Sequence, residues 1–185
     1  MSTANAELFP ILEAGRVPAN SSPLLDQVKK SFGFVPNLFA AFANSPVLLE
    51  AYLALNAAYE KASLTPVERQ LVLLAASVAN HCDYCTAAHS TVLKDMLDVS
   101  ADVVTAVRGN RPLANRRQDV LVNLARAMVS TRGEVPEQTL KAFLDAGYHS
   151  DQVAEVLVGV ALKTLSNYTS HLSPPDIDAA FASER

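Results

Sequence analysis

Apolar residues recur every three or four positions along most of this 185-residue chain, a spacing that predicts amphipathic helices. In the segment 47–61 the residues with this spacing are Leu48, Tyr52, Leu55 and Tyr59. A second stripe consists of Val120, Leu121, Leu124, Ala127 and Met128, and a third of Val153, Val156, Leu157, Val160 and Ala161. Residues 70–79 are apolar almost all round, which predicts a helix buried on most sides. The pattern favours an all-α fold with 70–79 in its core.

Capping residues and turn residues indicate where these helices begin and end. Thr65, Pro66 and Glu68 fit the N-cap, N1 and N3 positions of a capping box, so a helix should begin at position 66. Further starts are expected at Pro36, at Pro46 with Ser45 as its cap, and at Pro136, and Ser100 and Ser150 are expected to cap two more helices. Helix ends are expected at Gly33, Gly109, Gly133 and Gly147. A helix from about 83 to 97 should follow the buried one. The sequence thus predicts about eight helices and no strand.

Composition supports this fold class and a single domain. Half of the residues are apolar and only 6 are glycine, with Ala, Leu and Val dominant, which favours helix over sheet. A chain of this length can bury about 70% of its unfolded surface in one domain. Prolines and small polar residues in 1–23 predict an extended N-terminal arm, followed by one all-α domain over 24–185.

Charge and hydropathy exclude several classes of partner. The formal net charge is −4 and no basic block is present, so nucleic acid is not an expected partner. No stretch reaches 18 uninterrupted apolar residues, and residues 1–18 lack the basic start and apolar run of a secretory signal. We therefore expect no membrane partner and a cytoplasmic location. In that compartment two neighbouring cysteines are more often catalytic or redox-sensing than structural.

The two cysteines of the chain, Cys82 and Cys85, lie close together and are followed by His89. If the segment after Cys82 is helical, these three residues share one face. A disulfide across so short a loop would stabilise the fold by only about 2 kcal/mol, so a structural staple is a poor explanation. Zinc binding, with His81 as a fourth ligand, and inert packing of both thiols remain alternatives. The spacing favours a redox-active dithiol.

The residues alone leave open which cysteine is the nucleophile. Cys82 would lie at a helix N-terminus, which lowers the pKa of a thiol. His89 argues for Cys85 instead, because an imidazole four residues later can accept its proton. Either thiolate could attack a peroxide to give a sulfenic acid, which the second thiol would convert to a disulfide. Thiol–disulfide exchange with a protein would use the same groups.

The segment Leu64–Arg69, the buried helix after it and the motif Cys82-x-x-Cys85-x-x-x-His89 resemble the alkylhydroperoxidase D family of the carboxymuconolactone decarboxylase superfamily. Residues 147–156 resemble a later helix pair of that fold, and residues 167–172 the tail of its peroxidase-related branch. The resemblance implies an all-α AhpD-like fold, a trimeric or hexameric homo-oligomer, and reduction of hydroperoxides by an external dithiol or thiol protein. It also implies that Cys85 attacks the peroxide and Cys82 resolves the product, without a metal, flavin or other cofactor.

Two positions depart from the family pattern. The family's proton relay begins at a glutamate twelve residues before the first cysteine, where this chain has Gln70, and the position between the cysteines, often histidine, holds Tyr84. Glutamine can orient His89 as the base but cannot take its proton. We therefore expect Gln70, or Glu68 two residues before it, to orient His89.

Other polar residues and other functions complete the set of hypotheses. His81 and His149 are expected in turns, whereas Asn167 and His171, four residues apart, could reach the dithiol from the last helix. Gly159 is expected to allow close approach between helices. The alternatives to a peroxidase are a non-enzymatic redox-sensing or oligomeric interaction protein, and a decarboxylase acting on a lactone.

Overall fold

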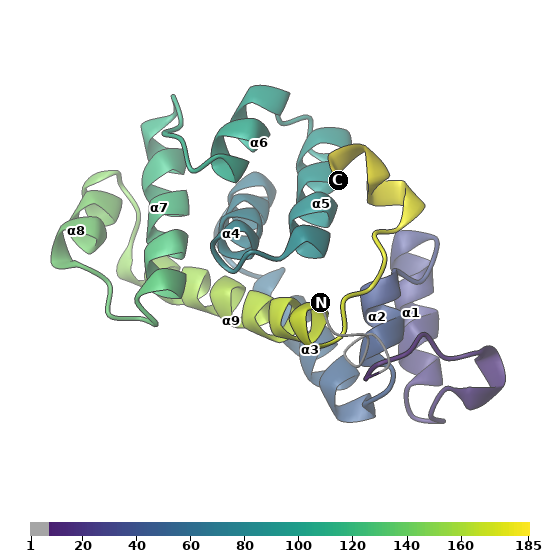
Figure 1. Ribbon diagram of the computed structural model, residues 1–185. Helices are drawn as coiled ribbons and strands as arrows, with labels where there is room; N and C mark the ends of the chain where they lie inside the picture. Colours follow the sequence, from purple (N-terminus) through teal and green to yellow (C-terminus); the bar gives the residue numbers. More distant parts are fainter. Residues whose placement is uncertain (1–7) are drawn as a thin grey trace.

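The computed structural model describes residues 8–185, and all regular structure in this range is helical (Figure 1). The α-helices are α1 (Ser22–Phe32), α2 (Asn37–Phe42), α3 (Pro46–Tyr59), α4 (Pro66–Ala79), α5 (Asp83–Thr91), α6 (Ala101–Arg108), α7 (Arg116–Ser130), α8 (Glu137–Asp145) and α9 (Ser150–Leu172). Two short 3-10 helices, Ala14–Arg16 and Ala179–Glu184, lie near the chain ends, and a π-helix, Val92–Met96, extends α5. The all-α prediction is confirmed, with nine α-helices in the described range against about eight expected.

Most helix boundaries agree with the sequence signals. The capping box of α4 is present: Thr65 Oγ1 accepts from the Glu68 backbone N–H at 3.2 Å, and Glu68 Oε2 accepts from the Thr65 N–H at 2.9 Å. Gly33 ends α1 with φ of +80°, a conformation that glycine adopts without strain. Three predicted starts differ by one position. Pro36 and Pro136 are the cap residues of α2 and α8 and not their first residues, and Ser150 is the first residue of α9, not its cap. The extended residue is His149, whose N–H donates to Gln152 Oε1 at 3.0 Å.

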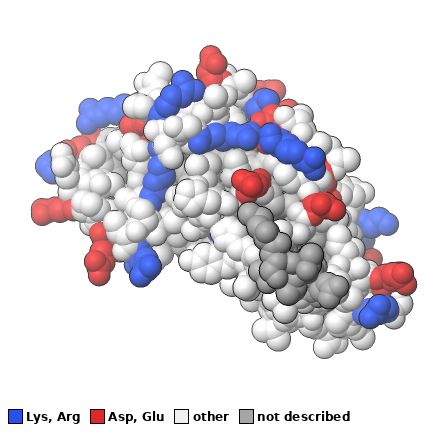
Figure 2. All heavy atoms as spheres, in the orientation of Figure 1, with Lys and Arg blue, Asp and Glu red and all other residues white. Residues whose placement is uncertain are grey.

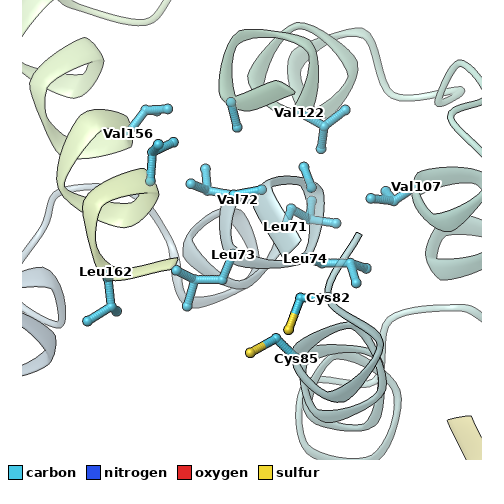
Figure 3. Packing of buried hydrophobic residues seen from close by; sticks show 14 of the residues in the cluster. Leu71, Val72, Leu73, Leu74, Cys82, Cys85, Val107, Val122, Val156 and Leu162 are labelled. Atoms are coloured by element: carbon cyan, nitrogen blue, oxygen red, sulfur yellow. The ribbon is translucent and has the colours of Figure 1, made fainter. Parts of the chain in front are cut away.

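Helix α4 forms the centre of the core, between α5, α6, α7 and α9 (Figures 1 and 3). Its residues 71–77 are all buried, as the almost entirely apolar run predicts. At Gly159 of α9, an added Cβ would lie 2.7 Å from Tyr59 Oη and 2.8 Å from Val72 Cγ1. Glycine therefore allows α9 to pack closely against α3 and α4, as predicted.

The core-facing side of α9 differs from the predicted stripe. Val156 and Val160 are buried as expected, but Leu157 is 54% exposed and Ala161 is also exposed. The helix is rotated so that its later buried positions include polar residues: Lys163, Ser166 and Asn167. Hydropathy alone does not predict this side of the helix, because polar side chains are usually exposed.

The last segment of the chain folds back over α5. Phe181 is buried in the 3-10 helix Ala179–Glu184 (yellow in Figure 1). Glu184 forms ion pairs with Lys94 and with Arg108, the latter at 3.1 Å. At the other end of the chain, the Phe9 N–H donates to Ser173 Oγ at 3.1 Å. Of the predicted arm 1–23, residues 1–7 lie outside the described residues, and α1 already begins at Ser22.

Basic and acidic side chains alternate on the face shown in Figure 2, without a field of one sign. None of the helices in residues 8–185 is long and apolar enough to cross a bilayer.

Candidate active site

The two cysteines lie at the tight connection between α4 and α5. His81 has φ of +57°, which turns the chain, and Cys82 is the extended N-cap residue of α5, with Cys85 in the first turn. The Cys82 N–H donates to the Ser77 carbonyl at 3.0 Å. Both thiols are buried, with 1% of Cys82 and 2% of Cys85 exposed, and they are not bonded to each other. Figure 3 shows the two sulfur atoms close together below α4.

The environment divides the two thiols into a donor and a thiolate. A hydrogen bond from the Cys82 thiol, the nearby Lys163 ammonium, and hydrogen bonds from Ser166 and Asn167 lower the pKa of Cys85 to about 6, against the effect of burial. The same interaction with Cys85, together with burial, raises the pKa of Cys82. At neutral pH the anion therefore resides on Cys85. The helix N-terminus, which argued for Cys82, is outweighed by these contacts.

His89 is held between two partners, and neither is a cysteine. Its Nδ1 lies 2.9 Å from Gln70 Oε1, and its Nε2 lies 2.7 Å from Lys163 Nζ. Because the amide oxygen only accepts and the ammonium only donates, the proton is assigned to Nδ1 and Nε2 is the acceptor. Burial and the Lys163 charge hold the pKa of His89 well below its usual value. The ring is neutral, and the direct His89–Cys85 proton transfer expected from the spacing is replaced by a contact with Lys163.

Lys163 was not singled out from the sequence. It is 1% exposed and hydrogen-bonds the Tyr52 hydroxyl as well as His89. Burial lowers its pKa, but the interaction with Cys85, followed by those with Tyr52 and Cys82, outweighs that effect and raises the pKa above its usual value. The available signal was a lysine next to Leu162 in an otherwise apolar stretch, since a buried lysine is almost always paired.

The structure places Glu68 away from His89. Glu68 Oε1 accepts from the Tyr148 hydroxyl at 2.6 Å and from Arg117 Nε at 3.2 Å, while Oε2 completes the capping box. These contacts connect the start of α4 to α7 and to the loop before α9. Of the two residues expected to orient His89, only Gln70 contacts it.

Of the remaining polar candidates, Asn167 contacts the dithiol, whereas His171 and His81 are exposed. Asn167 is fully buried, and its amide hydrogen-bonds Cys85 and accepts from Asn80 at 2.9 Å, so it reaches the dithiol within the same chain. His171 is exposed and stacks on the Tyr168 ring, with 6.4 Å between centroids. His81 is also exposed. Within residues 8–185, no three His, Cys, Asp or Glu side chains are grouped as metal ligands would be.

A cavity of about 360 Å³ lies beside Cys85. One part of its wall is polar and consists of Gln70, Cys85, His89 and Lys163. The aromatic residues in its wall are Phe32, Phe39, Tyr52, Tyr84 and Phe181. The Tyr84 hydroxyl donates to Asp178 Oδ2 at 2.5 Å, which fastens the C-terminal segment over this wall. Cys85 thus lines a mainly apolar cavity that has a cationic group, Lys163, in its polar part.

Comparison with known proteins supports the family resemblance. Residues 46–116 match the profile of the carboxymuconolactone decarboxylase family, while curated proteins gave no match. A crystal structure from Ralstonia eutropha JMP134, described as an alkylhydroperoxidase AhpD core and uncharacterized peroxidase-related protein, is 26% identical with a TM-score of 0.81. That match covers 96% of this chain and 95% of the other.

Two further crystal structures share the fold at lower identity. An uncharacterized peroxidase-related protein from Silicibacter sp. TM1040 is 18% identical with a TM-score of 0.81, covering 100% of this chain and 97% of the other. The debrominase Bmp8, solved in complex with 2,3,4-tribromopyrrole, is 17% identical with a TM-score of 0.79, covering 96% and 95%.

Proposed function

Because this chain belongs to the carboxymuconolactone decarboxylase family and has the alkylhydroperoxidase D-like fold, we propose that it is a thiol-dependent oxidoreductase that reduces hydroperoxides through Cys85 and Cys82. One observation carries the proposal: a thiol with a lowered pKa, Cys85, is hydrogen-bonded by a second thiol and faces a cavity large enough for an organic molecule. Activated cysteines of peroxidases combine thiolate character with a neighbouring resolving thiol.

The reaction follows from the roles of the two sulfurs. The Cys85 thiolate attacks the outer oxygen of the hydroperoxide, the O–O bond breaks, and the organic oxygen leaves as an alcohol after gaining one proton. Cys85 is then a sulfenic acid. The Cys82 thiol condenses with it, which forms the disulfide and releases water. An external dithiol or thiol protein returns both cysteines to the reduced state.

Peroxide consumption with a dithiol reductant tests this function. The wild-type protein should consume cumene hydroperoxide, and one equivalent without reductant should remove two hydrogens from the intact mass. Cys85→Ser should abolish turnover, whereas the matched variant Cys82→Ser should still form a sulfenic acid on Cys85 that a dimedone-type reagent traps. Two unreactive thiols in the folded protein would refute the proposal, and a sulfenic acid on Cys82 would reverse the roles.

The aromatic wall of the cavity supports a second candidate, the reductive debromination of an aromatic ring, which is the activity in the name of the fold relative Bmp8. Cys85 would take the bromine from the ring carbon, which gains a proton, and Cys82 would then displace bromide and form the same disulfide. Both candidates oxidise the dithiol by two electrons. Release of bromide ion from a brominated pyrrole or phenol, measured with peroxide absent, distinguishes them.

We also propose that the chain forms a homo-oligomer through the outer face of α9. That face presents the apolar side chains of Leu157, Tyr168 and Leu172 to solvent in the single chain. Light scattering during size-exclusion chromatography should give a mass above that of one chain, and Leu157→Arg should lower it. A wild-type mass of one chain would refute this proposal.

A further inference from the structure

A lysine that is only 1% exposed, Lys163, lies in the polar wall of the cavity beside Cys85. The Lys163 ammonium needs a counter-charge, because a buried and unpaired cation is strongly unfavourable. In the part of the chain that the structure describes, no carboxylate forms an ion pair with it. Its counter-charge must come from another kind of group.

The groups that face Lys163 come from three other helices. Tyr52 lies on α3, and Cys85 lies on α5 with Cys82 at its N-cap. His89 of α5 contacts Lys163 directly, and Gln70 of α4 contacts the other side of the His89 ring. Burial raises the pKa of Tyr52, so its phenol stays neutral. His89 is a neutral acceptor. The Cys85 thiolate is the remaining anion that can balance the Lys163 charge.

We propose that Lys163 is a catalytic residue of the dithiol cycle: its ammonium keeps Cys85 as a thiolate and donates a proton to the oxygen that leaves when the peroxide bond breaks. This inference rests on the proposed peroxidase function. Lys163 and Cys85 line the same cavity, and Lys163 Nζ lies 2.7 Å from Nε2 of His89, a third residue of that wall. His89 becomes a positioning residue, because its Nε2 accepts one N–H of Lys163 while Gln70 fixes the ring tautomer.

Protons and electrons balance over the cycle. The resting site holds a thiolate, a thiol and an ammonium group. Attack on the peroxide leaves a sulfenic acid, a thiol and a neutral amine, and releases the alcohol. Condensation releases water and leaves the disulfide beside the neutral amine. The external dithiol supplies two electrons and two protons, one to Cys82 and one to Lys163, which restores the thiolate on Cys85.

The first measurement is the pH dependence of Cys85 alkylation by iodoacetamide, followed by peptide mass mapping. In Lys163→Met the midpoint of this profile should rise from about 6 by about two pH units, toward that of a free thiol, so that the alkylation rate at pH 7 falls about tenfold. Lys141→Met, the same substitution at an exposed lysine on α8, is the control and should leave the midpoint unchanged. A midpoint in Lys163→Met equal to that of the wild type would overturn the inference.

The second measurement separates proton donation from simple charge pairing. It compares an alkyl hydroperoxide, whose alkoxide leaving group needs a proton, with a peracid, whose carboxylate leaving group does not. The comparison is made at a pH above the raised alkylation midpoint of Lys163→Met, where Cys85 is a thiolate in both proteins. There the rate of Lys163→Met with the alkyl hydroperoxide should be at least about tenfold below that of the wild type, within the usual range for acid catalysis, whereas its rate with the peracid should change little. Equal losses with both oxidants would refute the role as proton donor.

A further variant protects the test against misfolding. Lys163→Arg keeps the charge but holds its proton too tightly to donate it. It should therefore restore the low midpoint of alkylation without restoring the rate with the alkyl hydroperoxide. If the wild type consumed neither oxidant, the proposed peroxidase function would fail. The alkylation profile would still show whether Lys163 holds Cys85 as a thiolate.

Discussion

The substitution Glu68→Ala separates a structural role of this carboxylate from a role in proton transfer. In the structure, Glu68 caps α4 and binds Tyr148 and Arg117, whereas His89 is held by Gln70 and Lys163. A residue of the first kind should change the stability of the protein, and a residue of the second kind should change its rate.

The expected loss of stability follows from the three contacts. Removing a capping side chain costs about 1 kcal/mol, and depriving the buried Tyr148 hydroxyl of its short hydrogen bond adds about 1–2 kcal/mol. The ion pair with Arg117 adds little, since the arginine is 44% exposed and solvent screens the interaction. The free energy of unfolding should therefore fall by about 2–3 kcal/mol, which corresponds to roughly 5–10 °C in Tm for a chain of this size.

Urea denaturation gives the free energy of unfolding, and a peroxide-consumption assay at room temperature gives the rate. Glu68→Gln is the matched control, because its amide oxygen can still accept from Thr65 or Tyr148, so its loss of stability should be smaller. The rate of Glu68→Ala should stay within about twofold of the wild type, because only contacts made in the transition state change it. A rate collapse in a folded Glu68→Ala protein would show that Glu68 belongs to the proton relay.

Three further predictions test other parts of the structure. Hydrogen bonds from Tyr148, from Thr65 and from Arg117 outweigh burial and lower the pKa of Glu68. The contribution of Glu68 to stability is therefore complete above its unfolded pKa of about 4.3 and is lost as pH falls through the lower folded pKa. The midpoint of urea denaturation should accordingly fall at acid pH, and it should fall less steeply in Glu68→Gln. Gly159→Ala should destabilise the fold by about 2 kcal/mol, because overpacking of about 3 kcal/mol exceeds the roughly 1 kcal/mol gained in helix propensity. Thermal melting measures this loss, with Gly15→Ala as the control, because nothing lies within 4 Å of the added carbon there and its stability should not change. Equal stabilities of the Gly159→Ala and Gly15→Ala variants would contradict the packing argument. Tyr84→Phe removes the hydrogen bond to Asp178 and should increase amide hydrogen exchange over residues 176–184, whereas unchanged exchange would show that the other contacts alone hold the segment.

The helices themselves were largely predictable, because their signals are local. The capping box at Thr65, the glycine that ends α1 and the apolar run of α4 each specify structure within a few residues. The dithiol could be located for the same reason: Cys82, Cys85 and the start of α5 lie within one turn. Where neighbouring residues determine the structure, the sequence alone was sufficient.

The partners of His89 could not be predicted in this way. Lys163 is 74 positions away along the chain, and its burial depends on the rotation of α9, which Gly159 and the packing against α3 and α4 determine. Whether Glu68 or Gln70 orients His89 was equally unpredictable from the sequence. Both lie on α4, but only the tertiary arrangement shows that one side chain faces Tyr148 and the other faces His89.

The burial of both sulfur atoms limits which reductants can complete the cycle. Disulfide exchange requires the attacking sulfur to approach the disulfide along its S–S axis, so access determines the rate. A small dithiol can enter through the cavity beside Cys85, but a folded thiol protein is too large to do so. Such a protein could reach Cys82 only after the turn at His81 or the C-terminal segment fastened by Tyr84 has moved aside. The opening of these few residues would then set the recovery rate with a protein reductant, and the size of the reductant would decide which step of the cycle is slowest.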